Sequence, residues 1–371
     1  MFPEHRPHHF LNFGFGISDF GFAEVKSLAH SRSNVFNSNF KSGISNFKFQ
    51  NPKSAIRNPK SQIALSQTCN ITRLYFRIGM MQIADANEKV ELFDRSRGRL
   101  FGIAYRMLGT RADAEDILQE AYLRWHKVRT DDVETPEAWL VTVVTRLSID
   151  RLRKASSERE TYIGPWLPEP MITTPSPQDD AELASSLSIA FLTMLERLSP
   201  TERAVFLLHD VFDCEYGEIA RITDKTEPAV RQIAHRARER VRTDKRRFDF
   251  EPAQHRRLVE QFEAAAYAGD PNTLLGLFAG DIAVVSDGGG KVTAARTIVR
   301  GIAKVMRLFT IALPHIKEHV TTEIVEINGE PGVVEYFDGK PFAATTLESD
   351  GEKITTLYRV MNPDKLRGFE K

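Results

Sequence analysis

The amino-acid sequence predicts a multi-domain protein in which two all-α domains precede an α+β domain. Apolar residues recur at three- and four-residue steps from Glu91 to Lys154, the period of a buried helix face. Helical patterns return from Ala181 to Arg247, after a linker, Thr161 to Gln178, with five prolines. From Val320 onward apolar and polar residues alternate, and Asn-Gly and Asp-Gly pairs interrupt the runs. We therefore expect a curved antiparallel sheet in the carboxyl-terminal domain.

Composition excludes several classes of protein. The 371 residues carry no formal net charge, and the two cysteines, Cys69 and Cys214, are too few and too far apart for a disulfide framework or a zinc cluster. No stretch approaches the roughly 20 apolar residues of a membrane helix, and the amino terminus has no secretory signal. We expect a cytoplasmic protein without membrane contact, metal or cofactor.

The first 79 residues differ from the rest of the chain. They hold 11 of the 24 phenylalanines and show no sustained helical or strand period. A disordered tail, a small domain of unknown kind, and translated DNA upstream of the real start are the three interpretations. Met80 and Met81 stand where patterned sequence begins, so we draw no function from residues 1–79.

The first helical domain is expected over residues 85–156. Thr110 and Asp113 form an N-cap signal for its second helix, and Pro136 opens its third. Asp113, Asp116 and Glu120 share a side of the second helix opposite its apolar stripe. That side is an acidic surface for a basic partner or simply a solvated helix face.

Residues 181–248 carry the signals of a helix-turn-helix. Ser199 to Glu202 combine a capping box with proline at the first helical position. Asp224 stands where the turn needs a positive φ, and Thr226 caps the last helix. Between Pro228 and Arg247 the chain has eight basic residues and two acidic ones. Because a short helix, a turn and a capped helix precede and form this basic segment, a DNA-reading helix is favoured over a solvated basic face. The candidate DNA contacts there are Lys225, Thr226, Arg231, Gln232, His235, Arg236 and Arg238, with Arg242, Lys245, Arg246 and Arg247 as candidate phosphate contacts.

Two segments resemble one family. Asp113 to Trp125 resembles sigma region 2.2 of the extracytoplasmic-function sigma factors, and Leu198 to Arg238 resembles their region 4. The order region 2, linker, region 4 is that of this group. The resemblance implies that region 2 binds the clamp of the β′ subunit of core RNA polymerase and opens the −10 element, while region 4 reads the −35 element. It assigns core-polymerase binding to Asp113, Asp116, Gln119 and Glu120.

The third helix offers a basic surface for melted promoter DNA. Arg146 and Arg153 align on one side of it, with Arg151 and Lys154 near them. Such cations suit a single strand. The loop Arg129 to Thr135 is a weaker candidate for holding a flipped base.

Residues 253–371 resemble the SnoaL-like (NTF2-like) extension of one subgroup of these sigma factors, which implies an α+β cone. Three motifs carry this resemblance: Trp166 to Pro170 in the linker of residues 157–180, Asp287 to Lys291, and Asn362 to Leu366. We expect them to form an interdomain contact in which Trp166 inserts beside the glycine turn, although Trp166 could equally pack on its own domain. The candidate regulatory residues are Trp166, Leu167, Pro168, Asp287, Gly288, Gly289, Gly290, Lys291, Asn362, Pro363 and Asp364.

The sequence thus predicts a promoter-specific sigma factor that its carboxyl-terminal domain regulates in cis. The alternative is a DNA-binding regulator that senses a small ligand and does not join polymerase, and a cyclase or isomerase is a third class. A small ligand or a protein signal at the carboxyl-terminal domain is a further partner to consider. Asp287, His315 and His319 are the only candidates for acid or base chemistry, and no pairing among them follows from the sequence, so we expect no enzyme.

Overall fold

The computed structural model describes residues 87–129, 132–173, 187–242, 252–316 and 319–371. Contacts divide the chain into the units Met1–Met81 and Gln82–Lys371, and only the second contains described residues. The interpretations of residues 1–79, together with Cys69 and Lys245 to Arg247, lie outside the described residues. Of the helices in the described ranges, none is long and apolar enough to cross a membrane.

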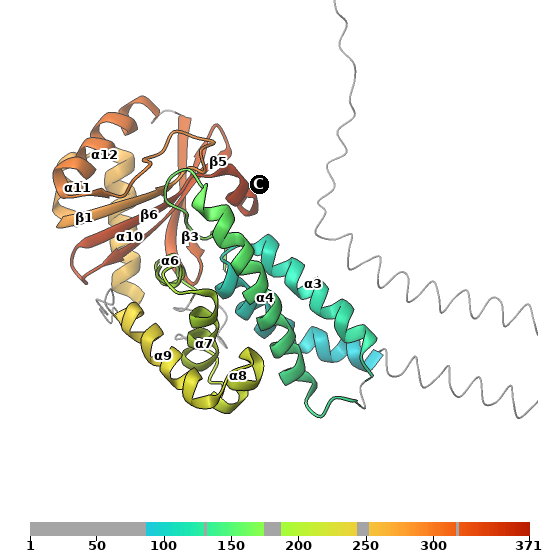
Figure 1. Ribbon diagram of the computed structural model, residues 1–371. Coiled ribbons are helices and arrows are strands. Elements are labelled where there is room, and N and C mark those ends of the chain that lie inside the picture. The colour runs from blue at the N-terminus through green and yellow to red at the C-terminus, as the bar shows by residue number, and fades with distance from the viewer. Residues whose placement is uncertain (1–86, 130–131, 174–186, 243–251, 317–318) are drawn as a thin grey trace, which may run out of the picture. The chain divides into compact units, whose positions relative to one another are not determined.

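The first helical domain consists of a helix of residues 87–108, α3 (Arg111–Lys127) and α4 (Pro136–Glu160) (Figure 1). Gly109, with φ of 77°, ends the first helix, and the Thr110 side chain accepts a hydrogen bond from the Asp113 amide, as the N-cap signal predicts. Trp125 is fully buried, and its indole N–H donates to the Lys89 carbonyl 3.2 Å away.

The second helical domain contains α6 (Ile189–Leu195), α7 (Pro200–Asp210), α8 (Tyr216–Thr223) and α9 (Glu227–Arg242). Ser199 and Glu202 form both hydrogen bonds of the predicted capping box. Asp224 has φ of 54° at the end of α8, which confirms the left-handed turn between α8 and α9.

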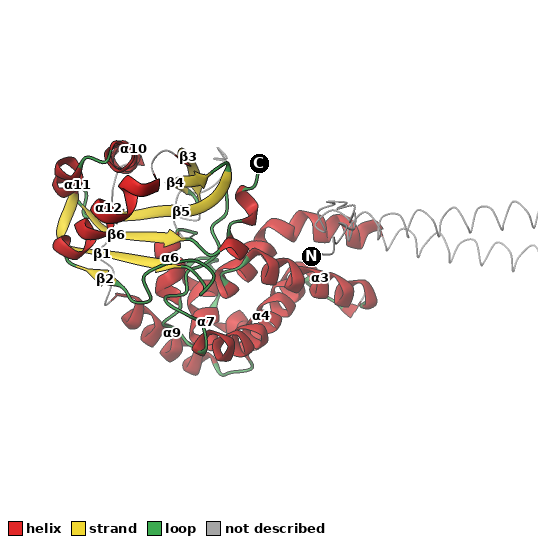
Figure 2. Cartoon of the chain, turned by 90° about the horizontal axis from the view of Figure 1, so that it is seen from above, coloured by secondary structure: helices red, strands yellow, loops and turns green. Residues whose placement is uncertain are grey.

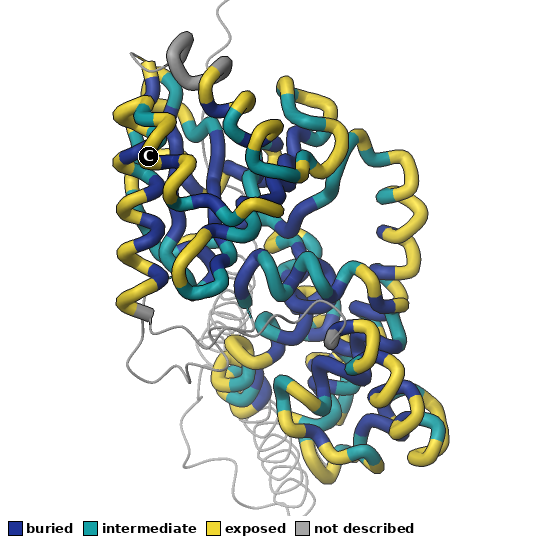
Figure 3. Tube along the Cα trace, turned by 90° about the vertical axis from the view of Figure 1, so that its left-hand side faces the viewer, coloured by how far each residue is buried: buried dark blue, intermediate teal, exposed yellow. Residues whose placement is uncertain are grey.

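The two helical domains share one apolar core. A single cluster of buried residues runs from Phe93 in the first helix through Leu140 in α4 to Leu207 in α7 and Val230 in α9. Figure 3 shows the buried stripes along these helices. The described prolyl linker therefore connects domains that are already packed together.

The carboxyl-terminal domain places three helices against a six-stranded sheet (Figures 1 and 2). Its strands lie in the order β2-β1-β6-β5-β4-β3. The prediction of an antiparallel sheet is wrong for one pair, because β1 and β6 run parallel, with α12 and four strands between them along the chain. The elements are α10 (Pro252–Ala268), α11 (Pro271–Leu277), β1 (Phe278–Asp287), β2 (Val299–Arg300), α12 (Ile302–Ile316), β3 (Val320–Ile327), β4 (Glu330–Phe337), β5 (Lys340–Ser349) and β6 (Ile354–Val360).

The two faces of this sheet have separate cores. One core includes Phe262 of α10, Phe309 of α12 and Leu357 of β6. The other includes Val360 of β6 with Leu167 of the linker and Phe369 near the carboxyl end. Alternation along each strand thus directs neighbouring residues to different partners.

Candidate functional site

Helix α9 has the apolar back and polar front that the sequence predicts. Val230, Ala234 and Ala237 are buried, while Gln232, His235 and Arg236 are exposed, as are Lys225 and Thr226 in the turn before the helix. Arg231 bonds Glu227 and stacks on the Tyr216 ring, and Arg238 bonds Asp210 at 2.8 Å. Exposed pairs of this kind contribute little to stability, so these contacts hold the two guanidinium groups only weakly.

Fewer carboxylates are exposed on the acidic side of α3 than the sequence predicts. Asp113 is only 19% exposed and accepts a hydrogen bond from Arg151 at 2.8 Å, and Arg151 also contacts Glu158. The sequence assigned Asp113 to polymerase and Arg151 to DNA, yet they bind each other. Asp116 and Gln119 are exposed, and Glu120 forms a surface pair with Arg124.

The basic side of α4 contacts the second helical domain. Arg146 donates from Nε to the Ile222 carbonyl at 2.8 Å and from Nη2 to the Arg221 carbonyl at 2.9 Å. These carbonyls belong to the last turn of α8, where a cation is favoured. Arg153 pairs with Asp150, and Lys154 is exposed. Arg146 is exposed, but carbonyls of the second helical domain already accept hydrogen bonds from its guanidinium group.

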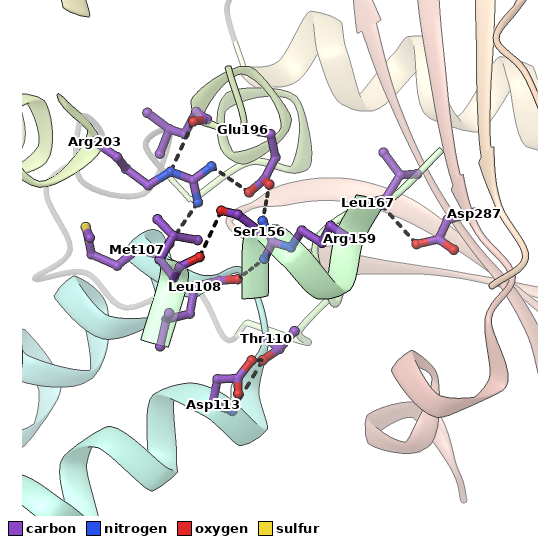
Figure 4. A network of polar contacts seen from close by, with 12 residues as sticks. Met107, Leu108, Thr110, Asp113, Ser156, Arg159, Leu167, Glu196, Arg203 and Asp287 are labelled. Atoms are coloured by element: carbon purple, nitrogen blue, oxygen red, sulfur yellow. Dashed lines mark hydrogen bonds and ion pairs between the residues drawn. The ribbon is translucent and has the colours of Figure 1, made fainter. Parts of the chain in front are cut away.

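A buried arginine joins the two helical domains (Figure 4). Arg203 of α7 is 1% exposed and donates to the Met107 carbonyl at 2.8 Å, to the Leu195 carbonyl and to Glu196. Burial lowers the pKa of Arg203, and the charge of Glu196 opposes this shift. Glu196 also pairs with Arg159 of α4, which donates to the Leu108 carbonyl.

The three motifs of the linker and the carboxyl-terminal domain meet at Asp287, which is fully buried. Its carboxylate accepts from the Leu167 amide at 2.9 Å, from the Tyr162 hydroxyl at 2.5 Å and from the Lys365 ammonium at 2.7 Å. The Gly289 amide donates to the same carboxylate at 3.1 Å. We call this cluster the junction: Tyr162, Trp166, Leu167, Asp287, Gly289, Asn362 and Lys365.

Trp166 does not insert beside the glycine turn, so this part of the sequence interpretation is wrong. A Cβ atom on Gly109 would lie 2.6 Å from the Trp166 ring, which places the indole against the end of the first helix. The Arg159 guanidinium carbon lies 3.7 Å from the centroid of the Trp166 ring, and the Lys365 ammonium nitrogen lies 4.2 Å from it. Tyr162 and Ile163 occupy the space beside Gly289 and Gly290.

The terminal segment completes the junction. Lys365 donates to the Leu167 carbonyl at 2.5 Å, and burial lowers the pKa of its ammonium, which the charge of Asp287 opposes. Asn362 donates to the Tyr162 hydroxyl at 2.9 Å. Gly289 has φ of 59°, and a Cβ there would lie 2.4 Å from Asn362, so only glycine fits. Among the other predicted residues, Pro168 and Gly288 are buried, Pro363 is exposed, and Lys291 pairs with Asp364 at the surface.

A second contact between domains escaped the sequence interpretation. Asn328, at the turn between β3 and β4, is fully buried and donates to the Tyr105 hydroxyl at 2.6 Å. Its side-chain oxygen accepts from the Met171 amide at 2.8 Å. The Asn-Gly pair signals a turn, but no local signal indicates its distant partner.

Of the candidate acid and base residues, Asp287 and His319 have described side chains, and these contact different partners. Asp287 is occupied by the junction, and His319 is exposed and pairs with Asp338. The side chain of His315 lies outside the described residues. Within the described ranges, no cluster of histidine, cysteine and carboxylate side chains could hold a metal ion.

Comparisons with known proteins identify the family. A profile of Sigma-70 region 2 matches residues 92–158, and one of Sigma-70 region 4 matches residues 188–241. The ECF RNA polymerase sigma factor SigJ of Mycobacterium tuberculosis is 37% identical over 294 residues, which cover 76% of this chain and 94% of SigJ. This chain is an extracytoplasmic-function RNA polymerase sigma factor.

Further relatives agree with the architecture of this sigma factor. A probable ECF sigma factor of the same organism, SigI, is 31% identical over 274 residues, covering 73% of this chain and 92% of SigI. The crystal structure of SigJ matches with a TM-score of 0.62 at 35% identity, over 75% of this chain and 98% of that one. The predicted fold class, two helical sigma domains followed by an NTF2-like domain, is confirmed. As a sigma factor, the protein acts in transcription initiation and binds core RNA polymerase and promoter DNA.

Proposed function

We propose that the carboxyl-terminal domain holds this sigma factor in a closed state and thereby controls its access to polymerase and promoter. One observation carries the proposal: region 2 and region 4 share a single apolar core, and the candidate DNA residue Arg146 caps a region 4 helix. The described contacts of the junction hold the linker between these regions to the carboxyl-terminal domain. Because a sigma factor acts on core polymerase, we also propose that the protein is located in the cytoplasm.

The geometry of a promoter supports the need for opening. The −10 and −35 elements lie about 25 base pairs apart, which is about 85 Å of duplex at 3.4 Å per pair. A compact body of about 155 residues has a radius of gyration of about 15 Å and is therefore about 40 Å across. Regions that share one core cannot span both elements, so the regions must separate before both are read.

Energy transfer between two dyes tests this separation. The dyes would be attached through Leu123→Cys in α3 and Lys225→Cys beside α9, both exposed, in a chain whose Cys69 and Cys214 are serine. We expect high transfer in the free protein and a clear fall when core polymerase and promoter DNA are added. Unchanged transfer in a complex that supports runoff transcription would refute the closed state.

The exposed part of the acidic α3 surface is our candidate contact for the β′ clamp. We expect Asp116→Lys with Glu120→Lys to weaken core binding about tenfold at low salt, or about 1.4 kcal/mol. Asp113 is left intact because its loss would remove one of the two carboxylates that contact Arg151. Core affinity would be measured by fluorescence anisotropy. The matched control, Asp281→Lys with Glu352→Lys, makes the same charge change on exposed sites of the carboxyl-terminal domain; equal affinities in both variants would contradict the assignment.

Arg231 is our candidate for reading one base pair of the −35 element. Arg231→Ala should relax the preference at one position by about 1–3 kcal/mol, because a bidentate contact to guanine would be lost. Arg246→Ala is the comparison, and it should weaken binding to every sequence alike. Affinities for a panel of −35 variants measure both effects, and an unchanged preference profile in Arg231→Ala would show that another residue reads the base.

A further inference from the structure

The geometry points to a binding site for a small, neutral, largely apolar molecule with one hydrogen-bond acceptor, inside the carboxyl-terminal domain. A cavity of about 440 Å³ lies between the sheet and the helices α10, α11 and α12. This volume falls within the range of small-molecule sites. Its apolar wall includes Phe262, Ala266, Leu274, Phe309, Val320 and Val333.

One charged pair, Arg359 with Glu335, supplies polar groups to this cavity. Arg359 of β6 and Glu335 of β4 both line it and bond each other at 2.8 Å, with side chains 15% and 10% exposed. In the described contacts of Arg359, one N–H group of the guanidinium donates to Glu335. A guanidinium has five such N–H groups. The remaining donors can receive an acceptor atom of a bound molecule.

The charges around the cavity select against an anion. Two carboxylates, Glu263 and Glu335, line the cavity beside one guanidinium. Each carboxylate already accepts a hydrogen bond from the protein, Glu263 from Thr322 and Glu335 from Arg359. A full negative charge on the ligand would be repelled by both, whereas a neutral ketone or amide oxygen can accept from Arg359 without that penalty.

The same strands connect the cavity to the junction. Arg359 faces the cavity, while Val360 beside it packs with Leu167 on the opposite face of the sheet. Two residues later the chain reaches Asn362 of the junction. A ligand that shifts β6 would therefore change the junction. This coupling rests on the proposed cis regulation, but the binding itself does not.

Binding can be tested with prodan, a neutral naphthalene dye with one ketone, added to the full chain without polymerase. We expect a saturable rise and blue shift of its emission. Ala266→Trp fills the cavity wall and should weaken binding at least tenfold, whereas Ala264→Trp, on the exposed side of the same helix, should leave it within twofold. Thr310→Trp, at an exposed lining position, gives a second blocking variant if Ala266→Trp fails to fold.

A second probe tests the hydrogen bond from Arg359 to the bound molecule. Phenylnaphthylamine is similarly apolar but has no carbonyl group. Replacing the pair by Glu335→Leu with Arg359→Met should weaken prodan about tenfold, the effect of a hydrogen bond to a charged group, and leave phenylnaphthylamine unchanged. Absence of saturable binding, or equal binding in both tryptophan variants, would overturn the site. These binding measurements do not depend on transcription. A failure of the site can therefore be distinguished from a failure of the proposed regulation.

Discussion

Replacing Arg203 by leucine is expected to lower the free energy of unfolding by about 3–5 kcal/mol, the usual cost of removing one member of a buried pair. The substitution removes the Arg203 donors from the carbonyls of Met107 and Leu195 and leaves Glu196 paired with Arg159 alone. Since a domain is stable by only about 5–15 kcal/mol, the loss is large. Urea denaturation followed by circular dichroism measures it.

The matched control removes an arginine from an exposed pair. Arg124→Leu breaks the contact with Glu120, in which both side chains are about half exposed, and should cost under about 0.5 kcal/mol. A similar cost for both variants would mean that Arg203 does not hold region 2 to region 4. Because Arg203 contacts Met107, we also expect its loss to reduce energy transfer between dyes on the two regions.

Local signals in the sequence predicted local structure well. Ser199 with Glu202, Thr110 and Asp224 fix their helix ends through residues at most four positions away, so no knowledge of the fold was needed. The parallel pairing of β1 with β6 was missed. It joins residues about 75 positions apart, which no short pattern reveals.

The site was predicted in its parts but not in its connections. The three motifs do meet, yet Tyr162 and Lys365 carry much of the contact with Asp287. Neither was named as a candidate residue, although Lys365 lies within the motif Asn362 to Leu366. A tyrosine and a lysine are common surface residues, and only their shared contact with Asp287 marks them. Likewise Asp113 and Arg151 each looked like a free charge until packing brought them together.

Asp287→Asn is expected to open the junction. The amide retains the size of the carboxylate but loses the charge that holds Lys365. In either orientation its NH2 group faces another donor, the Leu167 amide and Lys365 on one side or the Gly289 amide on the other. A cost of about 3–5 kcal/mol raises the open population by at least about a hundredfold. Hydrogen exchange of peptides that contain Leu167 should accelerate by a similar factor. Runoff transcription at limiting core polymerase should rise, because less protein remains closed.

A double-mutant cycle shows whether this effect runs through Lys365. Lys365→Met alone leaves Asp287 buried without its cation, so it should also accelerate exchange at Leu167. The double variant Asp287→Asn with Lys365→Met contains no unpaired buried charge, and we expect it to cost less than the sum of the single variants. Asp281→Asn, an exposed carboxylate on the same strand, is the control and should leave exchange unchanged. Additive costs would mean that the effect of Asp287→Asn does not depend on Lys365. Faster exchange without any change in transcription would show that the junction is structural rather than regulatory.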